Sequence, residues 1–305
     1  MSEPLKNELV WSHSRARAFE GCRRAYWFQY YGSFGGWEDG ATAEQKQAWV
    51  EKKLTSVPMW LGSVVHRAAE IGLGLARAGE VPQVEHARAW ARRTAEKDVD
   101  DSASGRWRER PARRVGFKEH YYGEAIPPDA IDLALTEIDR QVQVLFAHRV
   151  FRRLLAVPQR ILEVEELQRF KDGDVEIYVS LDVLVANEQG GLVIVDWKTG
   201  AAHDDGDIAG QLGVYGLYAT LMLGAAPGSL RAMHVNLRED RVVQHAVGDA
   251  ETSAARGHIV QSMARMRAPL RDVAANLADR DAFPPEELGS PRCRWCSFRG
   301  VCGRA

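Results

Sequence analysis

The sequence lacks the features that mark several large classes of protein. No apolar run approaches the roughly 20 residues that a membrane-spanning helix needs. The first residues, MSEPLKNELVWS, contain no apolar stretch typical of a secretory signal. The pattern G-x4-G-K-[ST] of an ATP-binding P-loop is absent. We therefore expect a cytoplasmic protein without a membrane partner, and one that is not itself an ATP-driven motor.

Charge of one sign is not in excess either. The 305 residues include 40 Lys and Arg against 42 Asp and Glu, a formal net charge of −2. This balance excludes a uniformly basic protein that coats nucleic acid, but it leaves room for a local basic groove. The hydrophobic share of 45% is enough for a buried core, and the length fits one large domain or two small ones.

Cysteine is scarce and unevenly placed. Cys22 stands alone near the start, whereas Cys293, Cys296 and Cys302 follow far downstream in C-x2-C-x5-C spacing. A reducing cytoplasm disfavours two disulfides, while four thiolates suit either zinc or an iron–sulfur cluster. The spacing of Phe19, Cys22 and the tyrosines after it predicts that Cys22 lies on the inward face of a helix.

Hydrophobic periodicity predicts helices at both ends of the chain and strands between them. Expected helices cover 12–31, 61–78, 84–98, 129–155, 207–223 and 250–278. Expected strands cover 161–170, 174–186, 192–197, 230–237 and 241–247. The turns KDGD and NEQGG should join the first three strands as an antiparallel meander. Residues 33–58 and 100–123 show no regular pattern. We expect an α/β or α+β fold, one domain over 1–305, and a helical insertion at 80–155.

Two aspartates interrupt the expected strands. Asp182 lies inside YVSLDVLV, where a buried charge is costly without a partner, and Asp196 ends LVIVDW. Pairing of these strands across NEQGG can bring the two carboxylates together, where they repel unless a cation lies between them. Lys198, two positions after Asp196, projects from the same face. Because Mg²⁺ and Mn²⁺ prefer hard oxygen ligands, the pattern predicts a site for one of them.

Three more polar side chains are expected on helices near this site. His66 lies one turn after Gly62, whose small size allows close approach, and Gln211 and Tyr215 are one turn apart after DWKTG. Each residue taken singly is more often an ordinary structural one. Their joint order favours phosphodiester hydrolysis, in which a metal ion activates water and an ammonium group stabilises the transition state.

The segments GSVVHRAAE, SLDVLV, IVDWKTG and QLGVY resemble, in this order, the RecB-like branch of the PD-(D/E)XK nuclease superfamily. The resemblance implies a restriction-endonuclease-like core, a central mixed sheet flanked by helices. The ligands that it implies for the metal ion are His66, Asp182, Asp196 and the carbonyl group of Trp197. The catalytic set that it implies is Asp182, Asp196, Lys198, Gln211 and Tyr215. Glu165, on the preceding strand, is expected only to support the site.

The segments SRARAFEGCRRAYWFQYYG and PRCRWCSFRGVCGR resemble the first and last motifs of nucleases in that branch that carry a 4Fe–4S cluster. AddB-type subunits, CRISPR-associated RecB-like nucleases and exonuclease V belong to this group. The resemblance implies a structural cluster on Cys22, Cys293, Cys296 and Cys302, joining residues 284–305 to Cys22; zinc is the alternative. A link between such distant residues strongly constrains the unfolded chain.

The stretch 106–118, RWRERPARRVGFK, carries six Lys or Arg with interleaved aromatic residues. Cations follow a phosphate backbone and aromatic faces stack on unpaired bases, which predicts DNA contacts; an exposed loop without this role is the alternative. The residues expected to contact DNA are Arg106, Trp107, Arg108, Arg110, Arg113 and Arg114.

These features predict a metal-dependent DNA exonuclease that acts on single-stranded or frayed ends. Repair, recombination or CRISPR spacer processing is the expected setting. One alternative is an inactive DNA-binding module of the same fold. Another is a subunit that works beside a separate helicase or a CRISPR integrase.

Overall fold

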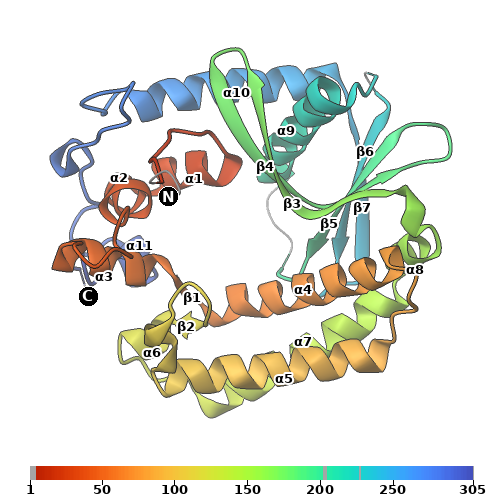
Figure 1. Ribbon diagram of the computed structural model, residues 1–305, viewed down its shortest axis with the longest axis horizontal. Coiled ribbons are helices and arrows are strands. Elements are labelled where there is room, and N and C mark those ends of the chain that lie inside the picture. Colours follow the sequence, from red (N-terminus) through yellow and green to blue (C-terminus); the bar gives the residue numbers. More distant parts are fainter. Residues whose placement is uncertain (1–4, 202–204, 227, 305) are drawn as a thin grey trace.

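A five-stranded mixed sheet lies between two groups of helices in the computed structural model (Figure 1). The structure describes residues 5–201, 205–226 and 228–304. The sheet order is β3-β4-β5-β6-β7, with bounds β3 Ile161–Asp172, β4 Val175–Ala186, β5 Leu192–Lys198, β6 Leu230–Asn236 and β7 Arg241–Val247. Strands β3, β4 and β5 form the expected antiparallel meander, β6 runs parallel to β5, and β7 is antiparallel to β6. The predicted mixed α/β fold is confirmed.

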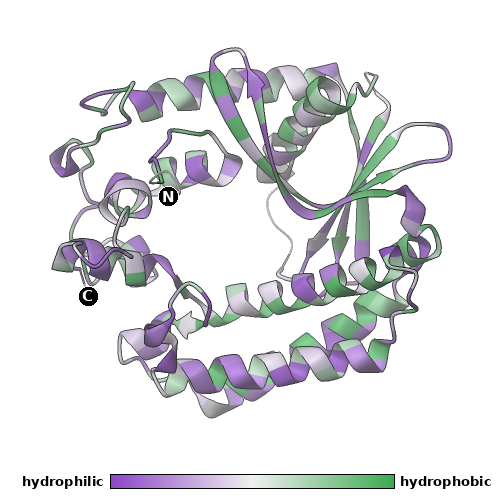
Figure 2. Ribbon diagram, viewed as in Figure 1, coloured by the Kyte–Doolittle hydropathy of each residue, from purple (hydrophilic) through white to green (hydrophobic). Residues whose placement is uncertain are grey.

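Helices from the first half of the chain cover one face of this sheet. They are α4 Val57–Arg77, α5 Val84–Ala103, α7 Pro128–Ala147 and α8 Arg149–Ala156. Their apolar side chains join Val183, Val195 and Trp197 in one buried cluster. Figure 2 shows that α5, at the edge of the molecule, is mainly hydrophilic, since α4 lies between it and the sheet.

The other face is covered by α1 His13–Gly21, α9 Asp205–Leu223 and α10 Asp249–Arg267. Here α9 makes the crossover that parallel pairing of β5 and β6 requires. Its apolar side chains pack on Ile177, Leu181 and Ile194 in a second cluster. Within the part of the chain that the structure describes, no helix is both long and apolar enough to span a membrane.

Shorter elements complete the chain. They are α2 Arg23–Trp27, η1 Phe28–Gly32, α3 Ala43–Lys52, β1 Leu54–Thr55, η2 Arg106–Glu109, β2 Gly116–Phe117, α6 Lys118–Tyr121, η3 Pro158–Arg160, η4 Arg280–Ala282 and α11 Pro291–Arg294. Strands β1 and β2 pair in parallel, and Figure 1 shows them between the terminal helices and the start of α4.

Two predicted long helices are interrupted. The helix expected over 12–31 breaks at Cys22, whose backbone is extended (φ −158°, ψ 120°) and whose Sγ accepts a hydrogen bond from the Ala25 amide. The helix expected over 129–155 breaks at His148, where the imidazole accepts from the Val150 amide at 3.2 Å. In both places a side chain caps a new helix, a local alternative to continuing the old one.

Two further expectations about helices are corrected. Residues 33–58 contain α3, whose start is fixed by a capping box between Thr42 and Gln45. The last long helix ends at Arg267 and not near 278. The chain turns back beyond it, because Asp272 and Leu277 form an isolated antiparallel bridge.

Candidate active site

His66 reaches the sheet from α4. Its Nδ1 lies 3.1 Å from Oε1 of Glu165 on β3, and its Nε2 lies 3.0 Å from the carbonyl oxygen of Trp197 on β5. The helix can approach β5 closely because Gly62 has no side chain: a Cβ there would lie 2.8 Å from Oγ1 of Thr199. The close approach that the sequence predicts at Gly62 is therefore a contact between α4 and Thr199.

Glu165 and Asp182 lie opposite each other at an irregular point of the sheet. The register pairs Val164 with Val183 and Glu166 with Leu181, which leaves Glu165 facing Asp182. Glu165 has a positive φ of 50°, a conformation that non-glycine residues seldom adopt. On β4, Leu181 and Val183 pack in opposite clusters although strict alternation would put them on one face. The alternation of side chains between the two faces of the sheet is therefore interrupted at Asp182 on β4.

This irregularity brings three potential ligands together. One ligand atom each from His66, Glu165 and Asp182 lies within 4.8 Å of the others. The Nδ1 of His66 is 3.5 Å from Oδ2 of Asp182, which also accepts a 2.7 Å hydrogen bond from the Trp197 amide. The sequence had assigned Glu165 only a supporting role, whereas the structure groups it directly with His66 and Asp182.

Asp196 and Lys198 form an ion pair at the end of β5. The Nζ of Lys198 lies 2.7 Å from Oδ2 of Asp196, whose side chain is buried. Both side chains therefore lie on one face, as their spacing predicts. The register of β4 and β5 pairs Val183 with Val195, so the next positions outward, Asp182 and Asp196, are opposite each other. Asp196 turns toward the lysine and is not part of the compact His66 group.

The crowded charges shift the pKa values of two groups. Burial lowers the pKa of His66, but its hydrogen bond with Glu165 and the negative charge of Asp182 outweigh that effect and raise the pKa to about 9. Burial raises the pKa of Asp182 to about 7; the charges of Asp196 and Glu165 add to this, while His66 opposes it. Carboxylates packed this closely need a cation or a proton between them.

Gln211 and Tyr215 approach the same carboxylates from α9. The Gln211 amide donates a hydrogen bond to the Tyr215 hydroxyl, which lies 3.4 Å from the carbonyl oxygen of Ser180 on β4. Burial raises the pKa of Tyr215 well above its usual value, and the charges of Asp196 and Asp182 raise it further. The hydroxyl therefore stays protonated beside the acidic group and can donate a hydrogen bond.

His234 is a neighbour of the site that the sequence did not reveal. The parallel register of β5 and β6 pairs it with Asp196, and its Nε2 lies 3.8 Å from Oδ2 of that aspartate. The residue is 4% exposed, and neither of its ring nitrogens has a hydrogen-bond partner among the residues that the structure describes. No local motif marks a histidine inside a buried strand as part of a site.

The four cysteines come together at the ends of the chain. Cys22, Cys293, Cys296 and Cys302 line one cavity of about 230 Å³. Burial raises the pKa of the Cys296 thiol to about 11 and also raises the pKa of Cys302, which the nearby guanidinium groups of Arg24 and Arg304 oppose. Cys22 lies at the helix break and not on the inward face of a continuous helix.

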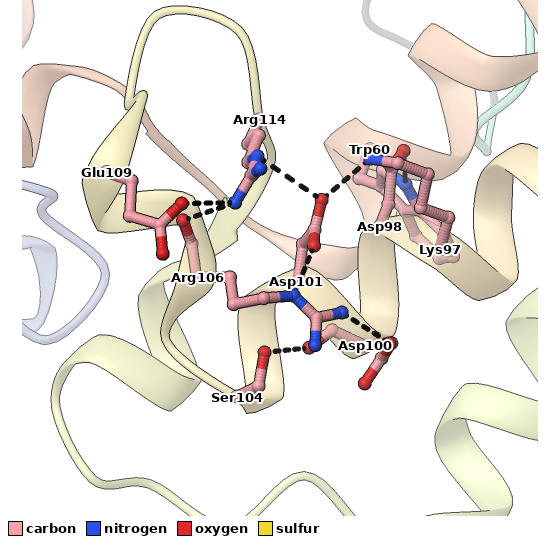
Figure 3. A network of polar contacts seen from close by, with 9 residues as sticks. All are labelled: Trp60, Lys97, Asp98, Asp100, Asp101, Ser104, Arg106, Glu109 and Arg114. Atoms are coloured by element: carbon pink, nitrogen blue, oxygen red, sulfur yellow. Dashed lines mark hydrogen bonds and ion pairs between the residues drawn. The ribbon is translucent and has the colours of Figure 1, made fainter.

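The stretch 106–114 is anchored to the protein and is not a free loop (Figure 3). The buried carboxylate of Asp101 accepts hydrogen bonds from Lys97 (2.7 Å) and Arg106 (3.0 Å), and Glu109 accepts one from Arg114 (3.0 Å). Trp107 is fully buried, and a side chain on Gly116 would overlap its ring.

Base stacking needs an exposed aromatic face, so Trp107 does not fit its predicted role. Arg106 and Arg114 are held by carboxylates, whereas Arg108 lies over the rings of Trp107 and Tyr121. The side chains of Arg110 and Arg113 are exposed.

The site thus combines hard oxygen ligands, an imidazole and an ammonium group, a set suited to metal-assisted hydrolysis of a phosphodiester. A sequence model described as the PD-(D/E)XK nuclease superfamily matches residues 10–303. No curated protein matches the chain. Among solved structures, the crystal structure of SSO0001 is similar over 60% of this chain and 77% of that chain, with 16% identity and a TM-score of 0.30.

Proposed function

This chain belongs to the PD-(D/E)XK nuclease superfamily, and we propose that it is a metal-dependent DNA nuclease of the RecB-like branch. The observation that carries the proposal is the group of His66, Glu165 and Asp182, with ligand atoms within 4.8 Å of one another, beside the ion pair of Asp196 and Lys198. Two carboxylates and an imidazole at this spacing fit Mn²⁺ or Mg²⁺.

The residues have distinct roles in this proposal. His66, Glu165 and Asp182 would hold the metal ion, and the negative charge of Asp196, which acts on His66 and Asp182, would favour a cation there. The ion supplies a Lewis acid and lowers the pKa of a bound water. Lys198, held at 2.7 Å by Asp196, would place a positive charge beside the phosphate and stabilise the negative charge of the transition state. Tyr215, protonated and hydrogen-bonded by Gln211, donates to a phosphate oxygen.

Cleavage of labelled DNA tests the site. With Mn²⁺, the wild-type protein should degrade single-stranded DNA, and Lys198→Ala should lower the rate by at least about 100-fold, the scale of losing one preorganised charge contact. Binding of the same DNA with Ca²⁺ should remain, because Lys198 acts on the transition state. If the wild-type protein binds DNA but leaves it intact, the chain is a binding module and the nuclease proposal fails.

We propose that the protein cuts DNA from free ends. Its setting would be repair, recombination or spacer processing, where it would work beside a separate helicase or integrase. Linear and circular single strands of the same sequence distinguish the modes. An exonuclease degrades the linear strand and spares the circle. Equal degradation of both would establish endonuclease action and exclude the exonuclease reading.

We also propose that the four cysteines hold a 4Fe–4S cluster. All four cysteines line one cavity of about 230 Å³, so a single bound group can be held by the four sulfur atoms together. Four thiolates suit an iron–sulfur cluster, with a single zinc ion as the alternative. The amides of Ala25 and Phe298 donate hydrogen bonds to Cys22 and Cys296 (3.5 and 3.4 Å), an arrangement that stabilises thiolates.

Metal analysis tests the cluster independently of the nuclease site. Protein purified without oxygen should be brown and contain four iron and four sulfide per chain by the stoichiometry of the cluster. Cys302→Ser should lose the colour. A colourless protein with one zinc per chain would overturn the cluster and leave the nuclease proposal intact.

A further inference from the structure

Trp295 stands out among the tryptophans of the chain because its side chain is 65% exposed, whereas Trp11, Trp60, Trp107 and Trp197 are buried. A large aromatic ring in water loses the favourable free energy that burial would give. Leu288, which lines a surface cavity together with Trp295, is 86% exposed. The exposed face of the Trp295 ring is open to contact with another molecule.

The ring is held on a rigid support. Trp295 lies between Cys293 and Cys296, and its carbonyl oxygen accepts a 3.0 Å hydrogen bond from the Lys118 ammonium group. The hydroxyl of Tyr122 donates at 2.7 Å to the carbonyl oxygen of Ser297, just beyond. Because the backbone that carries the ring is held in advance, ordering it costs little conformational entropy when a partner binds.

The surroundings of Trp295 are positively charged. A cavity of about 600 Å³ beside it is lined by Arg294, Arg299 and Arg304. The guanidinium group of Arg294 lies 5.2 Å from the centre of the Trp295 ring. Among the lining residues Glu124 alone is acidic, and it is paired with Arg299 at 2.5 Å. An aromatic face surrounded by cations matches an unpaired base with its phosphates better than it matches an uncharged protein partner.

The surface also has a short connection to the candidate active site. Lys118 directly follows β2, and β2 pairs with β1, which leads into α4. His66 lies on that helix roughly 14 Å from its start, at 1.5 Å per residue. A strand of 20 nucleotides, roughly 68 Å long at about 3.4 Å per nucleotide, is long enough to contact both places.

We infer that the surface formed by Trp295, Arg294 and Lys118 binds single-stranded DNA, with Trp295 stacking on an unpaired base. The inference rests on the proposed nuclease function and names the surface that holds its substrate outside the metal site. Duplex DNA keeps its bases stacked inside, so this surface should favour single strands and frayed ends.

Binding of fluorescent oligonucleotides tests this surface, with intact wild-type protein in Ca²⁺ so that DNA remains uncut. Trp295→Ala should weaken binding of a thymidine 20-mer by about 5- to 100-fold, the range for losing one base–aromatic stack. Trp295→Phe, which keeps an aromatic face, should stay within about threefold of the wild type. The loss in Trp295→Ala should be larger for the 20-mer than for a 4-mer, which is too short to contact both places.

Trp37→Ala is the matched control, because Trp37 is 43% exposed and lies outside the cavity. It should bind as the wild type does. Equal binding by wild type and Trp295→Ala would overturn the inference and leave the nuclease proposal standing. A loss in Trp295→Phe as large as in Trp295→Ala would also overturn it, since stacking would not be the cause. Failure of the wild type to bind or cut any oligonucleotide would instead overturn the proposed function itself.

Discussion

The side-chain amide of Gln141 donates a 2.9 Å hydrogen bond to the carbonyl oxygen of Thr199, so a helix from the 80–155 segment holds the chain directly after Lys198. Gln141 is fully buried, and its amide also donates to Glu137 at 2.8 Å. Through this contact α7 helps to position the site, a role that its sequence does not predict.

The carbonyl groups on either side of Thr199 are held as well. The Leu237 amide donates to the carbonyl oxygen of Lys198 at 2.7 Å, and the side chain of Asn236 donates to that of Gly200 at 3.1 Å. Three consecutive carbonyl groups thus accept hydrogen bonds from different parts of the chain. These hydrogen bonds fix the course of the backbone around Lys198.

Replacing Gln141 by leucine should impair catalysis more than DNA binding. The Thr199 carbonyl would lose its partner and Lys198 would shift, and a displacement of about 1 Å at a reacting group costs up to about 100-fold in rate. We expect kcat to fall by about 10- to 100-fold while KM for DNA changes little. Gln143→Leu is the control, since Gln143 is exposed on the same helix. If Gln141→Leu lowers only the melting temperature and keeps its kcat, the contact is structural alone.

Replacing Glu165 by glutamine should weaken metal binding. The carboxylate lies 3.1 Å from His66 and belongs to the compact ligand group. Loss of an outer-shell partner already costs about 10- to 100-fold in metal affinity, and a direct ligand should cost no less. Isothermal titration calorimetry with Mn²⁺ measures the change in metal affinity. Glu166→Gln removes an exposed carboxylate from the next position and should leave the affinity unchanged; an equal loss in both variants would point to general electrostatics.

Metal affinity should rise with pH. The pKa of His66 is raised to about 9, so at neutral pH the imidazole carries a proton that a cation must displace. Raising the pH toward 9 removes that proton and the competition, so affinity increases by up to about tenfold per pH unit for each proton displaced. Mn²⁺ titrations between pH 6 and pH 8.5, in two buffers of different ionisation enthalpy, count the protons released. A pH-independent affinity without proton release would show that His66 is not a ligand.

Replacing Gly300 by alanine should disturb the cysteine region. A Cβ at this position would lie 2.4 Å from Oε1 of Glu51, a buried carboxylate that accepts hydrogen bonds from the Val301 amide and the Tyr121 hydroxyl. Overpacking of this kind costs about 1–3 kcal/mol, and the displaced tail should retain less iron. Gly257→Ala, on an exposed helical position with nothing within 4 Å, is the control. Unchanged iron content and melting temperature in Gly300→Ala would contradict the packing argument.

The two hairpins of the meander are predictable from the sequence because their turns are marked. Gly173 in KDGD and Gly190 in NEQGG both adopt the positive φ that glycine tolerates. Between such turns, alternating apolar residues leave one register that buries them, and that register places Asp182 opposite Asp196. The spacing of Asp196 and Lys198 likewise determines that they share a face.

The rest depends on contacts that local sequence does not encode. The close approach of Glu165 to His66 requires an irregular backbone, which EVEEL does not signal. Trp107 is buried because Gly116 makes room for its ring, so a segment that reads as basic and exposed becomes partly core. Helical spacing put Cys22 on an inward face, since periodicity cannot reveal that a sulfur atom ends one helix and caps the next.

The sulfur atom of Cys22 consequently has two structural roles. Cys22 caps α2 through the Ala25 amide and also faces the cavity shared with the three distant cysteines. Serine in its place would preserve the cap, because a hydroxyl accepts the same hydrogen bond, yet would be a poor ligand for iron. Alanine would remove both. Comparing the two substitutions therefore separates the local folding of the first helices from the closure of the whole chain.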